Sequence, residues 1–225
     1  MFIRKDNTLR WKWIGFGTLV TLGLILLGIF FFDMPLFDLI NNPACNTSMP
    51  DTSDNLCVAA LLLGKIFKWK LLLGFAVISV IAFFFYKAFT NEYDFRYAFV
   101  KIKNSYVFYV LLSIVFACGF VKVLKVLIGR GRPIFADPML FNACSDLKDF
   151  QSMPSGHTAV SFAVLVMLGM LFPRIKWATW TLAIIIGVSR VYVGMHWVSD
   201  VILGAFVGML CADFAKAFLK KVNSK

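Results

Sequence analysis

Charged side chains are scarce in this 225-residue chain, of which only 16% is Asp, Glu, Lys or Arg and 60% is hydrophobic. Soluble domains contain about 25% charged and about 45–50% apolar residues. The shortage of charge therefore excludes an ordinary soluble domain and favours a polytopic helical membrane protein. The length suits one domain over residues 1–225 rather than two.

The first apolar run lacks both a charged residue and a cleavage site. It covers residues 13–32, which is about the length that a bilayer requires. A basic N-terminus precedes it, as in a signal peptide, but the run is too long for a signal sequence and no small-residue cleavage site follows it. We therefore expect a retained first span. Five more runs with few or no charges complete a predicted six-span, all-α bundle: 71–86, 105–121, 158–173, 177–189 and 201–212.

Acidic residues are few, at 12 against 23 basic ones. With six spans, one side of the membrane holds the N-terminus, residues 87–104, residues 174–176 and the C-terminal tail. That side carries 14 of the basic residues and only four of the acidic ones, which predicts that it is cytoplasmic. The net charge of +11 then reflects topology, and a chain of membrane spans argues against nucleic acid as a partner.

Only five cysteines are present, and three of them fall on the predicted non-cytoplasmic side, where disulfides persist. Cys45 and Cys57 lie in a polar, turn-rich loop over residues 33–57, and a bridge between them would close a short ring. Cys144 is an alternative partner and three free thiols are a further alternative, because spacing alone does not decide the pairing. We expect Cys118 and Cys211, inside spans, to pack as small apolar side chains.

Two other polar segments lie on the same predicted side. The basic and aromatic residues 64–70 suit either an interfacial anchor or a contact with a polyanionic lipid headgroup. The connection 134–153 has no clear periodicity, and we expect it to form a lid or a substrate-facing wall. Its three aspartates have no His or Glu beside them, so we interpret them as solvated carboxylates rather than metal ligands.

Histidine occurs only twice, each time in a polar block beside an apolar segment. His157 closes Pro-Ser-Gly-His at an expected helix start, where unpaired backbone N–H groups face an anion. His196 precedes Asp200 by four residues, so that both would share one face of a helix. The carboxylate would fix the tautomer and leave the other nitrogen free to attack phosphorus. Taken singly, a helix cap explains the first block, and a structural His–Asp pair explains the second.

A third block supplies cations. Lys125 and Arg132 are seven residues apart, or two helical turns, and Arg190 precedes His196. Guanidinium groups match phosphate oxygens bidentately, while Lys acts as a point charge. Such donors would stabilise the charge that develops during phosphoryl transfer. An interfacial anchor would explain any one of them equally well.

Taken together, the three blocks closely resemble the signature of the type-2 phosphatidic acid phosphatase superfamily. That signature is Lys-x6-Arg-Pro, then Pro-Ser-Gly-His, then Ser-Arg-x5-His-x3-Asp, and the chain matches every specified position within a core of residues 120–205. The resemblance implies that His196 is the nucleophile, that Asp200 orients it and that His157 is the general acid. It implies a phosphate site without metal or cofactor, formed by Lys125, Arg132, Ser155, Gly156 and Arg190.

Arg130 lies outside this signature, between two glycines, and we expect it to be an additional headgroup contact. The oligomeric state stays open, because Gly204 and Gly208 could pack helices within one chain or between chains.

The resemblance implies a membrane lipid phosphatase that removes a terminal phosphate from a phospholipid or glycolipid through a phosphohistidine. The active site would be periplasmic, in a bacterial inner membrane. The implied substrates are phosphatidic acid, phosphatidylglycerol phosphate, undecaprenyl pyrophosphate and lipid A. Two alternatives remain: phosphotransfer to an acceptor lipid through the same intermediate, and a proton-coupled transporter with a His–Asp relay. Vanadate haloperoxidases share the site, but they are soluble, so the spans argue against that activity.

Overall fold

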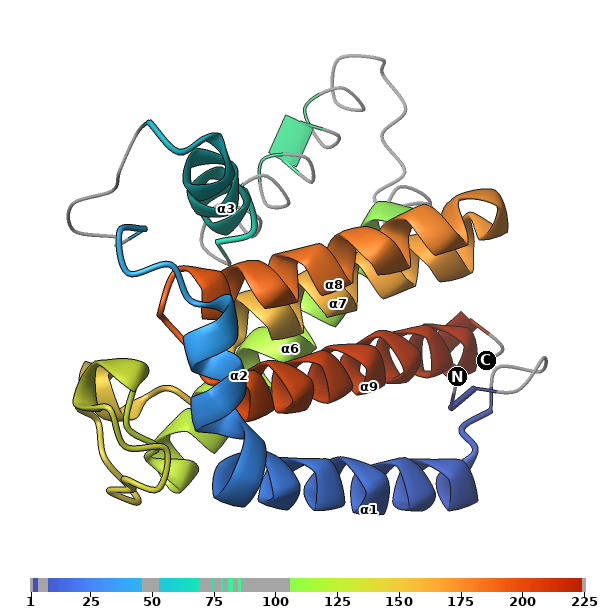
Figure 1. Ribbon diagram of the computed structural model, residues 1–225. Helices are drawn as coiled ribbons and strands as arrows, with labels where there is room; N and C mark the ends of the chain where they lie inside the picture. Colours follow the sequence, from blue (N-terminus) through green and yellow to red (C-terminus); the bar gives the residue numbers. More distant parts are fainter. Residues whose placement is uncertain are drawn as a thin grey trace.

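Helices dominate the described structure. The computed structural model describes residues 2–3, 8–45, 53–68, 74, 78, 81–82, 85 and 106–223 (Figure 1). Within these residues the only extended pairings are two isolated bridges, Ile3–Leu9 and Arg130–Phe141. The expectation of an all-α fold is therefore confirmed for the described part of the chain.

The longer helices are α1 (Trp11–Leu27), α2 (Asp33–Ile40), α3 (Asn55–Ile66), α6 (Tyr106–Ile128), α7 (Gly156–Leu171), α8 (Lys176–Tyr192) and α9 (Val198–Asn223). A π-helical turn, η1 (Gly28–Phe32), joins α1 to α2. Three single 3-10 turns follow at η2 (Pro133–Phe135), η3 (Lys148–Phe150) and η4 (Pro173–Ile175).

Three helical stretches of the described chain are long and apolar enough to cross a membrane: Trp11–Ile40, Tyr106–Ile128 and Val198–Leu219. The expected spans at 158–173 and 177–189 are present as the shorter helices α7 and α8. The expected span at 71–86 lies largely outside the described residues, so the count of six spans stays a prediction.

The expectation of a loop over residues 33–57 is wrong in part. The first helix continues through η1 into α2 and ends at Ile40, and α3 already begins at Asn55. The carboxylate of Asp33 can lie inside this helix because it is fully buried against Arg130, which compensates its charge. Sequence analysis gave no helix at α3, whose apolar stretch is too short for a span.

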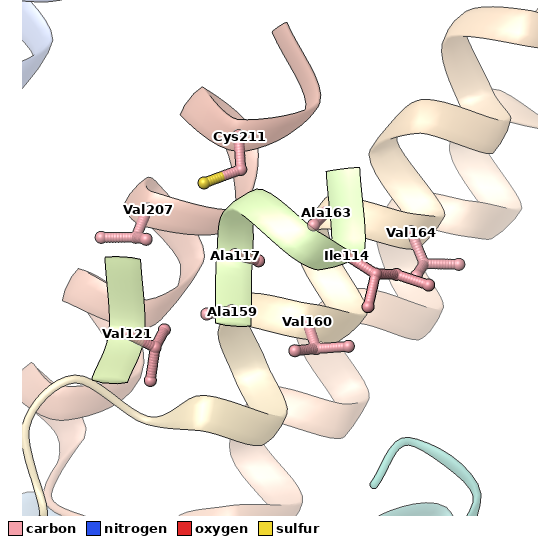
Figure 2. Packing of buried hydrophobic residues seen from close by; sticks show 9 residues of the cluster. All are labelled: Ile114, Ala117, Val121, Ala159, Val160, Ala163, Val164, Val207 and Cys211. Carbon is pink, nitrogen blue, oxygen red and sulfur yellow. The ribbon is translucent and has the colours of Figure 1, made fainter. Parts of the chain in front are cut away.

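The core lies between α6, α7 and α9 (Figure 2). Small and β-branched side chains from the three helices fill it: Ile114, Ala117, Val121, Ala159, Val160, Ala163, Val164, Val207 and Cys211. A Cβ atom at Gly204 would lie 2.7 Å from the carbonyl oxygen of Ser155, and one at Gly208 would lie 2.7 Å from the Cβ of Phe162. The two glycines therefore bring α9 close to α7 within the chain, which accounts for their spacing.

The disulfide between Cys45 and Cys57 is present, as one of the expected alternatives proposed, and Cys144 is a free, exposed thiol. Asp54 ties the start of α3 to the rest of the bundle. Its Oδ2 accepts hydrogen bonds from the Tyr192 hydroxyl at 2.9 Å and from Asn42 at 3.1 Å. These bonds, the one from Tyr192 most of all, lower the pKa of the Asp54 carboxyl. As a result α3 is held against α8.

All three polar blocks meet at one end of the bundle. The end of α6, the start of α7 and the turn from α8 into α9 lie together beside α2, whereas α1 begins and α9 ends at the opposite end (Figure 1). Backbone hydrogen bonds join the blocks directly, from Ser152 to Arg130 and from Ser155 to Asp200, each at 3.0 Å. The side of the membrane that this end faces stays a prediction.

Candidate active site

His196 lies in the turn between α8 and α9, not on a helix with Asp200 as the four-residue spacing predicts. The turn is possible because Gly194 adopts a positive φ of 70°, and α9 begins only at Val198. Asp200, in the first turn of α9, accepts the backbone N–H of Trp197 at 3.0 Å. The expected pair still forms, since Nδ1 of His196 lies 3.5 Å from Oδ2 of Asp200.

Each oxygen of the Asp200 carboxylate has a separate set of partners. The hydroxyl of Ser152 donates to Oδ2 at 2.5 Å and lies 3.4 Å from Nδ1 of His196. Arg130 donates to Oδ1 at 2.7 Å. Sequence analysis missed Ser152, which lies two residues before the Pro-Ser-Gly-His block and gives no signal of its own.

The surroundings of His196 favour a neutral imidazole. The side chain is 4% exposed, and burial lowers its pKa to about 3, assisted by the charges of Lys125 and Arg132 and opposed by Asp200. With Asp200 on the Nδ1 side, Nδ1 carries the proton and the lone pair of Nε2 is available. A neutral imidazole of this tautomer can act as a nucleophile.

Arg130 is not a headgroup contact, and that expectation is wrong. Its side chain is fully buried. It donates to Asp33 at 2.6 Å as well as to Asp200, and further hydrogen bonds reach Ser199 and the carbonyl oxygen of Pro138. Burial of a charged group at the end of an apolar run, such as Asp33, costs free energy unless a partner compensates the charge. That cost is the one signal from which the Asp33–Arg130 pair could have been inferred.

Lys125 and Arg132 do not lie on one helix, because α6 ends at Ile128 and Gly129 then adopts a positive φ of 59°. Both nevertheless line a cavity of about 490 Å³ that also contains Gly156 and Gln151. Lys125 donates to the carbonyl oxygens of Gln151 and, at 3.4 Å, of Ser152.

The guanidinium of Arg132 is held at the wall of this cavity by carbonyl groups. It donates to the carbonyl oxygens of Lys148 at 3.2 Å and Met195 at 3.3 Å. Burial lowers the pKa of Arg132, although Asp200 and Asp149 act against it. The cavity wall therefore carries a cation held by hydrogen bonds, as a phosphate site requires.

The start of α7 offers backbone donors. Ser155 precedes the helix without capping it, and its hydroxyl instead accepts a hydrogen bond from Thr158 at 2.9 Å. The first-turn N–H groups at Gly156 and His157 are therefore left for an anion. The imidazole of His157 lies within range of four positive charges: Arg190, Lys125, Lys68 and Arg132.

Arg190 is positioned by α3. Its Nη2 donates to the carbonyl oxygen of Ala60, and Nε and Nη2 both donate to the hydroxyl of Ser189 at 3.1 and 3.0 Å. Within the described part of the chain no group accepts a hydrogen bond from Nη1, which is the guanidinium atom nearest to Gly64. Gly64 lies directly against the guanidinium. Sequence analysis did not connect α3 with the site.

The donor set of the site suits phosphate rather than a metal ion. Its charged groups are mainly cations, and the Asp200 carboxylate is already taken up by Arg130 and Ser152. Among residues whose placement is described, no three His, Cys, Asp or Glu side chains lie close enough together to hold a metal.

Comparison with known proteins agrees with this geometry. The family model of the PAP2 superfamily matches residues 106–224, just over half of the chain. A Lipid A 1-phosphatase from Rhizobium johnstonii is 39% identical over 103 residues, which is 44% of this chain and 42% of that protein. The chain thus spans less than half the length of this relative.

Two solved structures have the same fold. The crystal structure of Aquifex aeolicus LpxE superposes with a TM-score of 0.55 at 25% identity, covering 84% of this chain and 97% of that one. The structure of a PAP2 type phosphatidylglycerolphosphate phosphatase from Bacillus subtilis gives a TM-score of 0.59 at 23% identity, covering 93% of this chain and 96% of that one.

Proposed function

Because the chain belongs to the PAP2 superfamily, we propose that it is a membrane lipid phosphatase that hydrolyses a terminal phosphate through a phosphohistidine on His196. The observation that carries this proposal is the convergence of all three polar blocks around one buried His–Asp pair. Nδ1 of His196 lies 3.5 Å from Asp200, and Lys125, Arg132 and the start of α7 lie at the same end of the bundle.

The proposed reaction has two steps. In the first, Nε2 of His196 attacks phosphorus while the bond from phosphorus to the lipid oxygen breaks, and His157, which is protonated when the phosphate anion lies beside it, gives its proton to that oxygen. In the second, His157 takes a proton from water while the water oxygen attacks phosphorus, the bond from phosphorus to Nε2 breaks, and inorganic phosphate is released. Asp200 holds the tautomer of His196 and stabilises the positive imidazole that forms after attack.

The phosphate oxygens are held by cations and by backbone donors in this proposal. The residues are Lys125, Arg132, Ser155, Gly156 and Arg190. Their arrangement supports the role, because Lys125, Arg132 and Gly156 line one cavity. Preorganised donors of this kind stabilise developing charge without reorganisation during the reaction.

Among lipid phosphates, we propose a glycolipid of the lipid A type as the first substrate to test. The similarity to a Lipid A 1-phosphatase and to Aquifex LpxE supports this choice. Lys68 places a positive charge near His157, so in this proposal residues 64–70 hold a polyanionic headgroup, with a simple interfacial anchor as the alternative. Phosphatidylglycerol phosphate, phosphatidic acid and undecaprenyl pyrophosphate complete the panel.

We further propose that the site opens on the periplasmic side of a bacterial inner membrane. The disulfide joins Cys45, after α2, to Cys57 in the first turn of α3. The two cysteines pack with Val193 and Met195 beside His196, and disulfides persist in oxidising compartments. The excess of basic residues in the segments predicted to be cytoplasmic gives the same orientation.

The test is phosphate release by purified protein from the four-lipid panel, with His196→Ala as control. The proposal expects release from at least one lipid by the wild type, inhibition by vanadate, and no loss of rate with EDTA. Retained activity in His196→Ala would contradict the nucleophile, and loss on chelation that magnesium restores would contradict the metal-free site. Label that appears on a second lipid instead of in free phosphate would identify a phosphotransferase.

A further inference from the structure

Three charged side chains from distant parts of the chain meet beside His196. Arg130 follows α6, Asp33 begins α2, and Asp200 lies in the first turn of α9, and none of the three side chains is exposed. Nη2 of Arg130 lies 2.6 Å from Oδ2 of Asp33, and Nη1 lies 2.7 Å from Oδ1 of Asp200. One guanidinium therefore bridges two buried carboxylates.

This bridge fixes the orientation of Asp200. Arg130 takes Oδ1, while Oδ2 faces Nδ1 of His196 and accepts from Ser152. A charge-assisted hydrogen bond of this length is strong and directional. Because the carboxylate cannot rotate without breaking it, Oδ2 is kept on the side of the imidazole.

Further contacts hold the guanidinium group of Arg130 in place. Its Nε and Nη2 donate to the carbonyl oxygen of Pro138 at 3.0 and 2.8 Å, and its guanidinium carbon lies 5.8 Å from the ring centre of Trp197. Asp33 is fastened in turn to Ser199, whose backbone N–H and hydroxyl donate to it at 2.9 and 2.5 Å. The start of α2 is thereby attached to the start of α9.

We propose that Arg130, held in place by Asp33, is a positioning residue that keeps the Asp200 carboxylate aimed at His196. This inference rests on the proposed function, in which His196 attacks phosphorus. Both residues act through Asp200. The first helix thus contributes to the site through Asp33 at its π-helical bend, outside the residues that carry the three polar blocks.

A simple balance of buried charge is the competing explanation, and the two differ in what a lysine can do. A lysine at position 130 would keep the positive charge but would lack the planar fork that reaches two carboxylates with separate nitrogens. If Arg130 only balances buried charge, the Arg130→Lys variant should keep its phosphatase activity. If Arg130 positions Asp200, the activity of this variant should fall.

The kinetic experiment compares Arg130→Lys with the exposed control Arg174→Lys on the lipid that the wild type hydrolyses best. Hydrogen-bond partners that orient metal-ligating side chains contribute about 10- to 100-fold to activity, and we take the same range for a residue that orients Asp200. We expect a fall in kcat of that size with KM unchanged for Arg130→Lys, and no change for the control. Wild-type kcat in Arg130→Lys would overturn the proposal.

A double variant covers the case in which Arg130→Lys fails to fold. Asp33→Asn with Arg130→Gln removes one charge of each sign and lets the two amide side chains bond to each other. If Arg130 positions Asp200, this double variant inserts and folds, but its kcat is well below that of the wild type. A return to wild-type kcat would mean that only charge balance matters, and the proposal would be wrong.

A second readout does not depend on activity. Because the chain has only two histidines, isotope-labelled histidine gives two assignable imidazoles in an NMR spectrum, with His157→Gln identifying the signals. We expect the wild type to hold His196 as the Nδ1–H tautomer and Arg130→Lys to mix both tautomers, with His157 unchanged. An unaltered His196 tautomer would contradict positioning. If the wild type releases no phosphate, the proposed function fails, while this comparison still tests Arg130.

Discussion

Gly64 of α3 lies directly against the guanidinium group of Arg190. A Cβ atom at Gly64 would lie closest to Nη1 of Arg190, 2.8 Å from its Cζ and 2.9 Å from its Nη2. Such distances are too short for any real side chain, so a larger residue would move the guanidinium. Because that group is the flexible end of a long side chain, the fold would survive while the phosphate contact would not.

We therefore predict that Gly64→Ala lowers kcat/KM about 10- to 100-fold, since a hydrogen bond to a charged group contributes about 1.5–3 kcal/mol. Thermal unfolding should change little. Gly23→Ala is the matched control, because a Cβ there meets no atom within 4 Å. Steady-state kinetics of both variants check the prediction, and equal kcat/KM values in the two would show that α3 does not position Arg190.

The disulfide Cys45–Cys57 also holds α3 in place, at the end of the helix opposite to Gly64. Replacing Cys45 and Cys57 by serine opens a ring of 12 residues in sequence separation, which in the chain-entropy model costs about 3 kcal/mol of stability. We expect a lower unfolding temperature and a higher KM, because α3 loosens and Arg190 loses its support. Cys144→Ser, which alters a free and exposed thiol, should leave both unchanged. If KM stays at the wild-type value after loss of the disulfide, α3 does not contribute to phosphate binding.

Ser152 provides a test of the hydrogen bonds around Asp200. Its hydroxyl donates to the charged carboxylate of Asp200 at 2.5 Å, and we predict that Ser152→Ala lowers kcat about 10- to 100-fold, since a hydrogen bond to a charged group contributes about 1.5–3 kcal/mol. Ser161→Ala removes an equally buried hydroxyl that bonds only within its own helix and should have no effect on kcat. Equal kcat values in the two variants would show that the hydrogen bond from Ser152 to Asp200 does not contribute to the reaction.

The buried imidazole of His196 predicts how stability depends on pH. An unfolded histidine binds a proton below about pH 6.5, whereas burial lowers the pKa of folded His196 to about 3. Between these values only the unfolded state is protonated at this site. Stability therefore falls as the pH drops through this window, by up to about 1.4 kcal/mol per pH unit from this one group, and the loss is absent above about pH 6.5.

Thermal unfolding between these pH values, compared for the wild type and His196→Gln, measures that dependence. The variant lacks the titrating group, so its stability should decline more gently toward acid pH. Equal slopes for the two proteins would mean that His196 takes up a proton in the folded state as readily as in the unfolded one.

The short-range chemistry of the site could be predicted from the sequence, whereas its supports could not. His157, His196 and Asp200 stand in local patterns whose spacing suits phosphoryl transfer, and the structure brings these residues to one end of the bundle. Even there, the helical arguments failed for His196 and Arg132, because Gly194 and Gly129 turn the chain out of the helix. A helical spacing predicts contact only while the helix continues.

The contacts that the sequence did not reveal join residues far apart along the chain. Arg130 lies 97 positions from Asp33 and 70 from Asp200, and Arg190 lies 130 positions from the carbonyl group that it contacts in α3. No local pattern encodes such pairings, which arise only when the helices pack. A carboxylate at the end of an apolar run, such as Asp33, needs a partner when it is buried. The sequence does not show which residue that partner is.

The most direct test of the central claim is to trap the phosphorylated protein. With only two histidines in the chain, lipid carrying radiolabelled phosphate can be mixed with excess protein, quenched in alkali, and digested to locate the label. The account predicts an alkali-stable, acid-labile label on the peptide that contains His196, present in the wild type and absent in His196→Gln. Label on His157, or undiminished label in His196→Gln, would contradict it.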